Sequence, residues 1–197
     1  MNEMIKMVVV LTILCCVSGG LLASIHDGTA AQIENQQLKF VKGPAIKTIL
    51  EGSSNDPITD RFKITDGDVE RNFFVGKFDG KANTIAFEGL GKGFGGDLGI
   101  MVGVNLDDQK LVGVAVTTHS ETPGLGAKAK EDPGFSAQFK GLSVDEDIKV
   151  TNDGGDINAI SGATITSRAV CDAVNKSLAA YKRIKPQLTE QIQAFEK

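Results

Sequence analysis

The most chemically suggestive stretch of the sequence is SGATITS at residues 161–167, directly before a strongly amphipathic segment. Its small residues leave the backbone accessible, and three further hydroxyls surround Thr164. The amphipathic segment predicts a helix, whose first N–H groups lack partners and whose dipole is positive at that end. Such a helix start can bind a phosphate group. The alternative is an ordinary N-cap at Thr166 or Ser167 after a glycine turn, and the pattern alone favours this cap.

A second stretch, HSETPGLG at residues 119–126, combines polar groups with an open backbone. Its Pro-Gly pair predicts a tight turn, and Gly126 would let a ligand approach the main chain. Leu125 offers an apolar surface, whereas Glu121, Thr122 and exposed amides offer hydrogen bonds. A planar, partly polar ring needs this mixture. On its own, however, the stretch is more typical of a surface turn.

Other chemistries find little support in the sequence. His26 directly follows the long uncharged apolar run at residues 7–25, at the expected membrane border, and His119 is the only other histidine, so a zinc site built on a histidine pair is excluded. A Ser-His-Asp triad would depend entirely on His119. The three cysteines, Cys15, Cys16 and Cys171, have neither the spacing of a metal site nor that of a disulfide framework. We therefore predict no metal site and no catalytic residue.

A glycine-rich motif and the net charge of the chain limit which ligands we expect. The glycine-rich stretch GKGFGG at residues 91–96 lacks the strand–turn–helix setting of a dinucleotide fingerprint, so it predicts a flexible turn. The net charge of −4 argues against nucleic acid, because phosphate backbones need a concentrated positive field. Small molecules and other proteins remain as ligands.

The first thirty residues indicate a membrane anchor. Residues 7–25 carry no charge, and as a helix they would span roughly 28 Å, close to the ~30 Å hydrocarbon core of a bilayer. Lys6 precedes this run and Asp27 follows it, so the positive-inside tendency keeps the N-terminus cytoplasmic and the rest of the chain extracytoplasmic. A cleaved signal peptide is the alternative, but the apolar run is long for one and residues 21–23 are a poor cleavage site.

After an anchor at residues 1–26, the sequence predicts a helical connector and one α+β domain. Residues 27–60 have a helical pattern interrupted at Gly43-Pro44, end in a polar loop, and are expected to pack on the domain. Residues 61–197 would form that domain, an antiparallel sheet with flanking helices.

The clearest signal in the domain is a β-hairpin. Within residues 61–117, which alternate as strands do, residues 100–106 and 112–116 flank a DDQK turn and share one apolar face. Gly103 and Gly113 would lie on the other face. There the missing side chains either let another group approach closely or merely weaken the strands.

The rest of the domain is expected to be a loop and a helix. Residues 119–142 are rich in glycine and proline and predict a loop. A helix is predicted from about Ser167 to Tyr181, because apolar residues recur on one face, and Pro186 follows shortly after it.

Taken together, the two chemically suggestive stretches resemble a known family. HSETPGLG (119–126), FKG (139–141) and AISGATITS (159–167), in this order behind an apolar anchor, are similar to the FMN-binding domain of the G subunit of Rnf electron-transport complexes. The C subunit of the sodium-pumping NADH:quinone reductase shares much of this pattern. The resemblance covers the anchor and most of residues 85–180, whereas residues 29–80 match only in general character.

The resemblance implies a covalent flavin. In the family, FMN is joined through its phosphate to the last threonine of Ser-Gly-Ala-Thr, which is Thr164 here, and a separate flavin transferase makes the bond with FAD as donor. Such a phosphodiester would keep a negative charge near the helix start and leave the ring unmodified. The other residues expected at the cofactor are Ser161, Gly162, Ala163, Thr166 and Ser167 around the attachment point, Glu121, Thr122, Leu125 and Gly126 around the ring, and Lys128 near the phosphate or the ring.

The ring itself has few aromatic partners to choose from. With one tyrosine and no tryptophan, stacking would rely on Tyr181, a phenylalanine or aliphatic side chains, or the ring stays partly exposed. Asn158 stands where family members often have Asp, three residues before the motif serine. Asp153 or Asp156 could serve in its place.

The predicted function is that of a one-electron flavin carrier in an ion-translocating oxidoreductase complex. The sequence supplies no nicotinamide site and no iron–sulfur cysteines, so the chain cannot run the whole redox reaction alone. By resemblance, its partners would be membrane subunits and a soluble side that oxidises ferredoxin.

Two alternatives belong to other classes of protein. One is an anchored interaction module that uses the same scaffold without flavin. The other is a secreted hydrolase using Ser120, Ser136 or Ser161 with His119, although no neighbouring residue in the sequence would orient that base.

Overall fold

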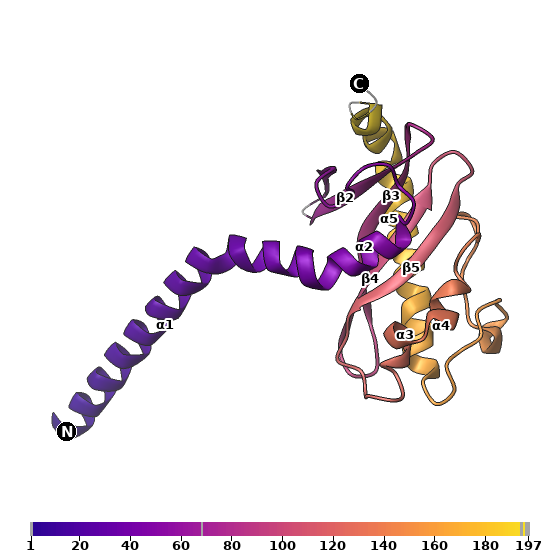
Figure 1. The fold of residues 1–197 in the computed structure, drawn as a ribbon. Helices are drawn as coiled ribbons and strands as arrows, with labels where there is room; N and C mark the ends of the chain where they lie inside the picture. Colours follow the sequence, from indigo (N-terminus) through magenta and orange to yellow (C-terminus); the bar gives the residue numbers. More distant parts are fainter. Residues whose placement is uncertain (1, 68, 194, 196–197) are drawn as a thin grey trace. The chain divides into compact units, whose positions relative to one another are not determined.

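A computed structural model describes residues 2–67, 69–193 and 195. The chain forms two compact units, Met1–Lys39 and Phe40–Lys197. An apolar N-terminal helix precedes a five-stranded antiparallel sheet with helices, which confirms the predicted α+β class (Figure 1).

The first unit is made mostly of the helix α1, Asn2–Gln36, none of whose residues is buried. The continuous helical run Asn2–Ile49 reaches a mean hydropathy of 2.5, and among the described residues it is the one helix long and apolar enough to cross a membrane. Thr12 and Ser24 donate their hydroxyls to the carbonyl four residues earlier, at 2.8 Å and 2.9 Å. Such bonds satisfy polar side chains where water is absent.

The helical run changes register where the sequence pattern is interrupted. The π-helix η1, Gln37–Lys42, leads into α2, Gly43–Ile49. Pro44 lies in the first turn of α2, directly after the π-helix ends. The predicted interruption is therefore confirmed as a helix boundary, and residues 51–60 form a loop as expected.

The sheet is a simple meander. Its strands are β1 (Arg61–Asp66), β2 (Val69–Phe78), β3 (Lys81–Lys92), β4 (Asp97–Asn105) and β5 (Lys110–Thr118). Each strand pairs antiparallel with the next, so the order in the sheet is the order in the sequence. The predicted hairpin is confirmed, since Val102 of β4 pairs with Val114 of β5. Phe73 of β2 likewise pairs with Phe87 of β3.

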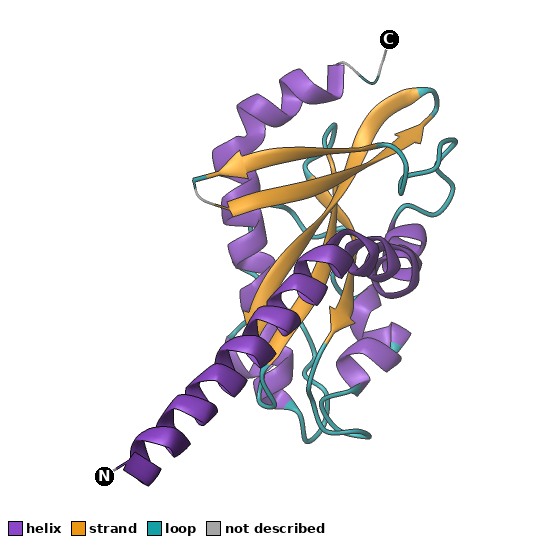
Figure 2. Cartoon of the chain, turned by 90° about the vertical axis from the view of Figure 1, so that its left-hand side faces the viewer, coloured by secondary structure: helices purple, strands orange, loops and turns teal. Residues whose placement is uncertain are grey.

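One face of the sheet is covered by the long helix α5, Thr164–Gln193, chiefly over β3 (Figure 2). Gly89 and Gly91 of β3 make this close packing possible. A Cβ at Gly91 would lie 2.8 Å from Cβ of Ala173, and a Cβ at Gly89 would overlap the hydroxyl of Ser177. The strand glycines and small helix residues together fix where α5 lies, and with it the start of the helix.

The opposite face carries α2, which packs against β4 and β5. Ile49 lies over Gly103 and Gly113, the two glycines of the predicted hairpin. A Cβ at Gly113 would be 3.4 Å from Cγ1 of Ile49, an ordinary contact, whereas a Cβ at Gly103 would overlap Cγ2 of Ile49. Gly103 therefore permits the close approach of another element, which is one of the two interpretations of the sequence, whereas Gly113 does not need to be glycine for this contact.

The C-terminal helix is longer than predicted. Its expected range, 167–181, stops before Pro186, yet α5 continues through this residue to Gln193. Ile184 and Leu188, on either side of the proline, are buried. Burial of the continuing apolar face compensates for the hydrogen bond that proline cannot donate, so the prediction of the helix end was wrong.

Residues 119–142, predicted as a loop, contain two short helices beside β5. These are α3, Lys128–Glu131, and α4, Pro133–Ala137. Asp132 caps α4 by accepting a hydrogen bond from the N–H of Gly134 at 2.9 Å. Helices of four and five residues are too short to show a periodic apolar pattern, which explains why the sequence did not predict them.

The contact of Ile49 with the two glycines predicts unequal effects of one substitution. Gly103→Ala should lower the free energy of unfolding by about 1–3 kcal/mol, because the added methyl group overlaps Ile49 and comes 2.6 Å from Cγ2 of Val112. Gly113→Ala should change it by less than about 0.5 kcal/mol, the range of substitutions that disturb no packing. Chemical denaturation of both variants tests this, and equal stabilities would contradict the packing described.

Candidate functional site

The two chemically suggestive stretches line one cavity of about 460 Å³. They are brought together although two short α-helices and a 3-10 helix separate them in sequence. The lining residues are Phe94, Glu121, Thr122, Leu125, Gly126, Gly162, Ala163, Thr164, Ile165 and Thr166. The volume lies in the usual range for small-molecule sites.

Direct contacts join the two stretches. Gly162 has a φ of +77°, a left-handed conformation that favours glycine, and a Cβ there would lie 3.2 Å from Cδ2 of Leu125. Thr166 donates its hydroxyl to Oε2 of Glu121 at 2.6 Å. The cavity is therefore built by side-chain contacts between the stretches and not by their chance proximity.

The carboxylate of Glu121 links three segments. Glu121 is 7% exposed, and its other oxygen, Oε1, accepts a hydrogen bond from the backbone N–H of Gly95 at 2.8 Å. Gly93 and Gly126 lie directly against the Glu121 side chain. A Cβ at Gly126 would lie 2.8 Å from Cβ of Glu121, and a Cβ at Gly93 would overlap Oε1. The glycine-rich turn at residues 91–96 thus encloses a buried charge, a role that the sequence did not suggest.

The start of α5 leaves polar groups available at the cavity. Thr164 is the first residue of α5, its side chain is half-buried, and its hydroxyl has no hydrogen-bond partner among the described residues. The first backbone N–H of the helix that finds a carbonyl is that of Ser167, which bonds Ala163 O at 3.0 Å. Unpaired N–H groups at a helix start, with the positive end of its dipole, suit an anionic group such as a phosphate.

The predicted cap at Thr166 or Ser167 is wrong, because both residues lie inside α5 and are buried. The hydroxyl of Ser167 accepts from the N–H of Ile160 and donates to Ala163 O, each at 3.0 Å. These bonds hold the turn that precedes the helix. Thr166 lines the cavity but gives its hydrogen to Glu121.

Three of the predicted site residues do not line the cavity. Ser161 is exposed just before it, Lys128 is exposed at the first position of α3, and Ser167 is fully buried behind the turn. Tyr181, one of the candidates for ring stacking, is also elsewhere: it is buried, stacks on Phe87 and donates to Gln109 at 3.0 Å.

Two lining residues were missed from the sequence. Phe94 is 72% exposed and Ile165 is 53% exposed, so neither is held by the core. Both left a signal, since Phe94 is an isolated aromatic residue among glycines and Ile165 lies off the apolar face of its helix. Exposed apolar side chains around a cavity mark a ligand surface.

The segment before the SGAT motif at residues 161–164 is held by polar contacts. The Arg168 guanidinium bonds both oxygens of Asp153, in the 3-10 helix η2 (Thr151–Asp153), at 2.6 Å and 2.7 Å, and holds the pKa of that carboxyl below its usual range. Gln138 bonds both backbone groups of Asn158, accepting from the N–H at 2.7 Å and donating to the carbonyl at 3.2 Å. Asp156 is exposed.

The hydrolase alternative gains nothing from the geometry. Nδ1 of His119 accepts the backbone N–H of Glu121 at 3.2 Å, and none of its hydrogen bonds in the described chain reaches a serine. Ser136 lines a different cavity. Cys171 is buried, and burial raises the pKa of its thiol to about 12, so it is not a nucleophile.

Comparison with known proteins agrees with this geometry. The family model of the FMN-binding domain matches residues 93–179. The G subunit of the ion-translocating oxidoreductase complex of Methanosarcina acetivorans is 34% identical over 180 residues, covering 90% of this chain and 94% of that protein. The protein of the same name from Vibrio cholerae is 31% identical and covers 92% of each chain. The G subunit of the proton-translocating ferredoxin:NAD(+) oxidoreductase complex of Clostridium ljungdahlii is 29% identical, over 85% of this chain and 86% of its own length.

Two solved structures share the fold. The C subunit of the Na(+)-translocating NADH-quinone reductase from Parabacteroides distasonis matches with a TM-score of 0.59 and 24% identity, over 76% of this chain and 92% of that one. NqrC from Shewanella oneidensis matches with a TM-score of 0.54 and 23% identity, over 70% and 72%.

Fold and cavity together define an FMN-binding domain behind an apolar N-terminal helix. The chain belongs to the family of G subunits of ion-translocating oxidoreductase complexes, the Rnf-type family that its motifs resemble.

The position of Glu121 predicts a large effect of its removal. Glu121→Ala should lower the free energy of unfolding by about 2–4 kcal/mol, because the N–H of Gly95 and the hydroxyl of Thr166 lose a charged acceptor in a buried place. Glu131→Ala, at an exposed position at the end of α3, is the matched control and should change it by less than about 0.5 kcal/mol. Denaturant titration measures both, and comparable stabilities would contradict the role given to the carboxylate.

Proposed function

We propose that this chain is a membrane-anchored electron-transfer subunit that carries FMN esterified through its phosphate to Thr164. The observation that carries the proposal is the hydroxyl of Thr164, which lacks a hydrogen-bond partner in the described chain and stands at the start of α5 inside the cavity. Membership of the family of G subunits and the match to the FMN-binding domain support it.

The residues of the cavity fit the parts of FMN. Its phosphate would lie at the free N–H groups of Thr164, Ile165 and Thr166, where the helix dipole favours negative charge. Its ring would lie among Leu125, Phe94 and Ile165, whose exposed apolar surfaces would otherwise face water. FMN supplies one-electron redox chemistry, and the chain supplies the position of the ring.

The geometry also suits attachment by a separate enzyme. Ser161, Gly162 and Ile165 are exposed around Thr164, so a flavin transferase could reach the hydroxyl. In the proposed reaction the Thr164 oxygen forms a bond to the FMN-side phosphorus of FAD and gives up its proton, while AMP leaves. The covalent link keeps the flavin at the chain even in an open compartment, because tethering sets a high effective concentration.

We propose the topology from the charges around the apolar run. Residues 1–26 would span the membrane with the N-terminus in the cytoplasm, residues 27–60 would connect, and residues 61–197 would form the FMN domain outside. Partners would be other membrane subunits, with electrons derived from a soluble, ferredoxin-oxidising side. The family relative from Clostridium ljungdahlii is named as part of a ferredoxin:NAD(+) oxidoreductase complex.

A pair of substitutions tests the attachment. When the chain is produced with a flavin transferase, the wild type should give a yellow band that stays fluorescent on a denaturing gel. Thr164→Val should remove this fluorescence, because valine has the shape of threonine without the hydroxyl. Thr164→Ser should keep it, since the nucleophilic oxygen remains.

The same gel separates the proposal from its main alternative, an anchored interaction module without flavin. A wild type that stays colourless in the presence of an active transferase would support that alternative. Fluorescence that persists in Thr164→Val would instead move the attachment to another residue.

A further inference from the structure

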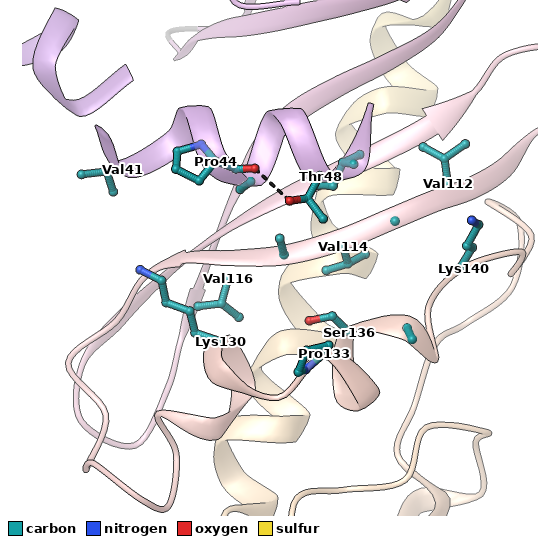
Figure 3. Close-up of a pocket in the computed structure, with 15 residues that line it drawn as sticks. Val41, Pro44, Thr48, Val112, Val114, Val116, Lys130, Pro133, Ser136 and Lys140 are labelled. Atoms are coloured by element: carbon teal, nitrogen blue, oxygen red, sulfur yellow. Dashed lines mark hydrogen bonds between the residues drawn. The ribbon is translucent and has the colours of Figure 1, made fainter. Parts of the chain in front are cut away.

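A second cavity, of about 440 Å³, follows the edge strand β5 and shares no residue with the flavin site (Figure 3). Its floor runs along the strand from Val112 to Val116. One wall is α2, with Pro44 and Thr48, and the other is the α3–α4 pair. The groove is therefore an elongated channel whose length, four residue steps of strand, is about 13 Å.

The edge of β5 is covered only at its beginning. Leu111 exchanges both backbone hydrogen bonds with the chain at residues 141–142, each at 2.8 Å. After Leu111 no described segment bonds the outer edge of the strand through its backbone. Among the described residues, the group that bonds this part of the edge is a side chain, the ammonium of Lys130, which donates to the carbonyl of Thr117 at 2.7 Å. Between these two points the groove contains peptide groups for which the described residues provide no hydrogen-bond partner.

Unpaired peptide groups in an apolar channel decide what the channel can hold. An acyl chain would fill the space but remove water from these groups and give no hydrogen bond in return, which is unfavourable for each group. An extended peptide would pair with them and bury its own apolar side chains against the walls. An exposed edge of this kind is otherwise a liability for aggregation.

The charge of the lining specifies the peptide further. Lys130 and Lys140 are its charged residues, and they lie toward opposite ends of the groove (Figure 3). No acidic residue lines it. No described carboxylate pairs with Lys140 within salt-bridge distance, so that ammonium is available to a partner.

We infer that this groove docks an extended, apolar segment of a partner protein with at least one acidic side chain, which adds a sixth strand beside β5. The inference does not depend on the flavin at Thr164. It gives the chain a protein-binding surface separate from the cavity that handles electrons.

The test places a photo-reactive p-benzoylphenylalanine at position 137, an exposed lining residue of α4, in the full chain within its native membrane assembly. Irradiation should crosslink it to one other polypeptide, and peptide mapping should find an extended, apolar segment with Asp or Glu. Lys140→Glu should reduce the crosslink about tenfold or more, because it sets like charges against each other. Lys176→Glu, at an exposed position of α5 outside the groove, should leave it unchanged.

A lipid adduct, a crosslink to a second copy of this chain, the absence of any adduct, or an unchanged yield in Lys140→Glu would each overturn the inference. Hydrogen exchange gives a second readout that needs no substitution: those amides of residues 113–116 that face away from β4 should exchange about tenfold or more slowly in the assembly than in the purified chain. Flavin fluorescence measured on the same samples reports the attachment at Thr164 separately, so the two proposals can fail independently.

Discussion

The carboxylate of Glu121 is buried, and a buried charge is tolerated only when protein groups replace the water that it has lost. Here the replacements are the N–H of Gly95 and the hydroxyl of Thr166, from two segments far apart in sequence. Glycine is needed at positions 93 and 126 because a side chain there would occupy the space of the carboxylate or of Cβ of Glu121. One buried carboxyl group therefore holds the glycine-rich turn, the Pro-Gly turn and the start of α5 around a single cavity.

A second constraint acts through the sheet. Gly89 and Gly91 let α5 lie directly on β3, and Ile49 packs on the other face over Gly103 and Gly113. Both layers are thus set by glycines in strands, where a missing side chain decides how close a helix can come. Because α5 is fixed along its length, its first turn is fixed too. Thr164 therefore lies at the cavity, beside the unpaired backbone N–H groups of that turn. The groove along β5 shares no lining residue with this cavity, so the proposed flavin site and the proposed docking site use separate surfaces.

The sequence predicted the helices and strands in which apolar residues recur at regular spacing. It missed the features that depend on tertiary contacts. The strand pairing followed from alternation and a good hairpin turn, and the resemblance of two motifs pointed to the cavity. The continuation of α5 through Pro186 was missed because burial of Leu188 outweighs a local helix breaker. Likewise, nothing in the local pattern showed that Glu121 is enclosed by Gly93, or that Phe94 faces the cavity, since both facts depend on which segments meet in three dimensions.

The proposed link between the chain and the flavin is the hydroxyl of Thr164. Peptide mass spectrometry of the chain, purified from membranes in which its complex is active, examines this link without any substitution. The peptide containing Thr164 should have the mass of FMN added with loss of one water, and fragmentation should place the addition on Thr164. An unmodified Thr164 peptide from a chain that nevertheless supports electron transfer would contradict the proposed link.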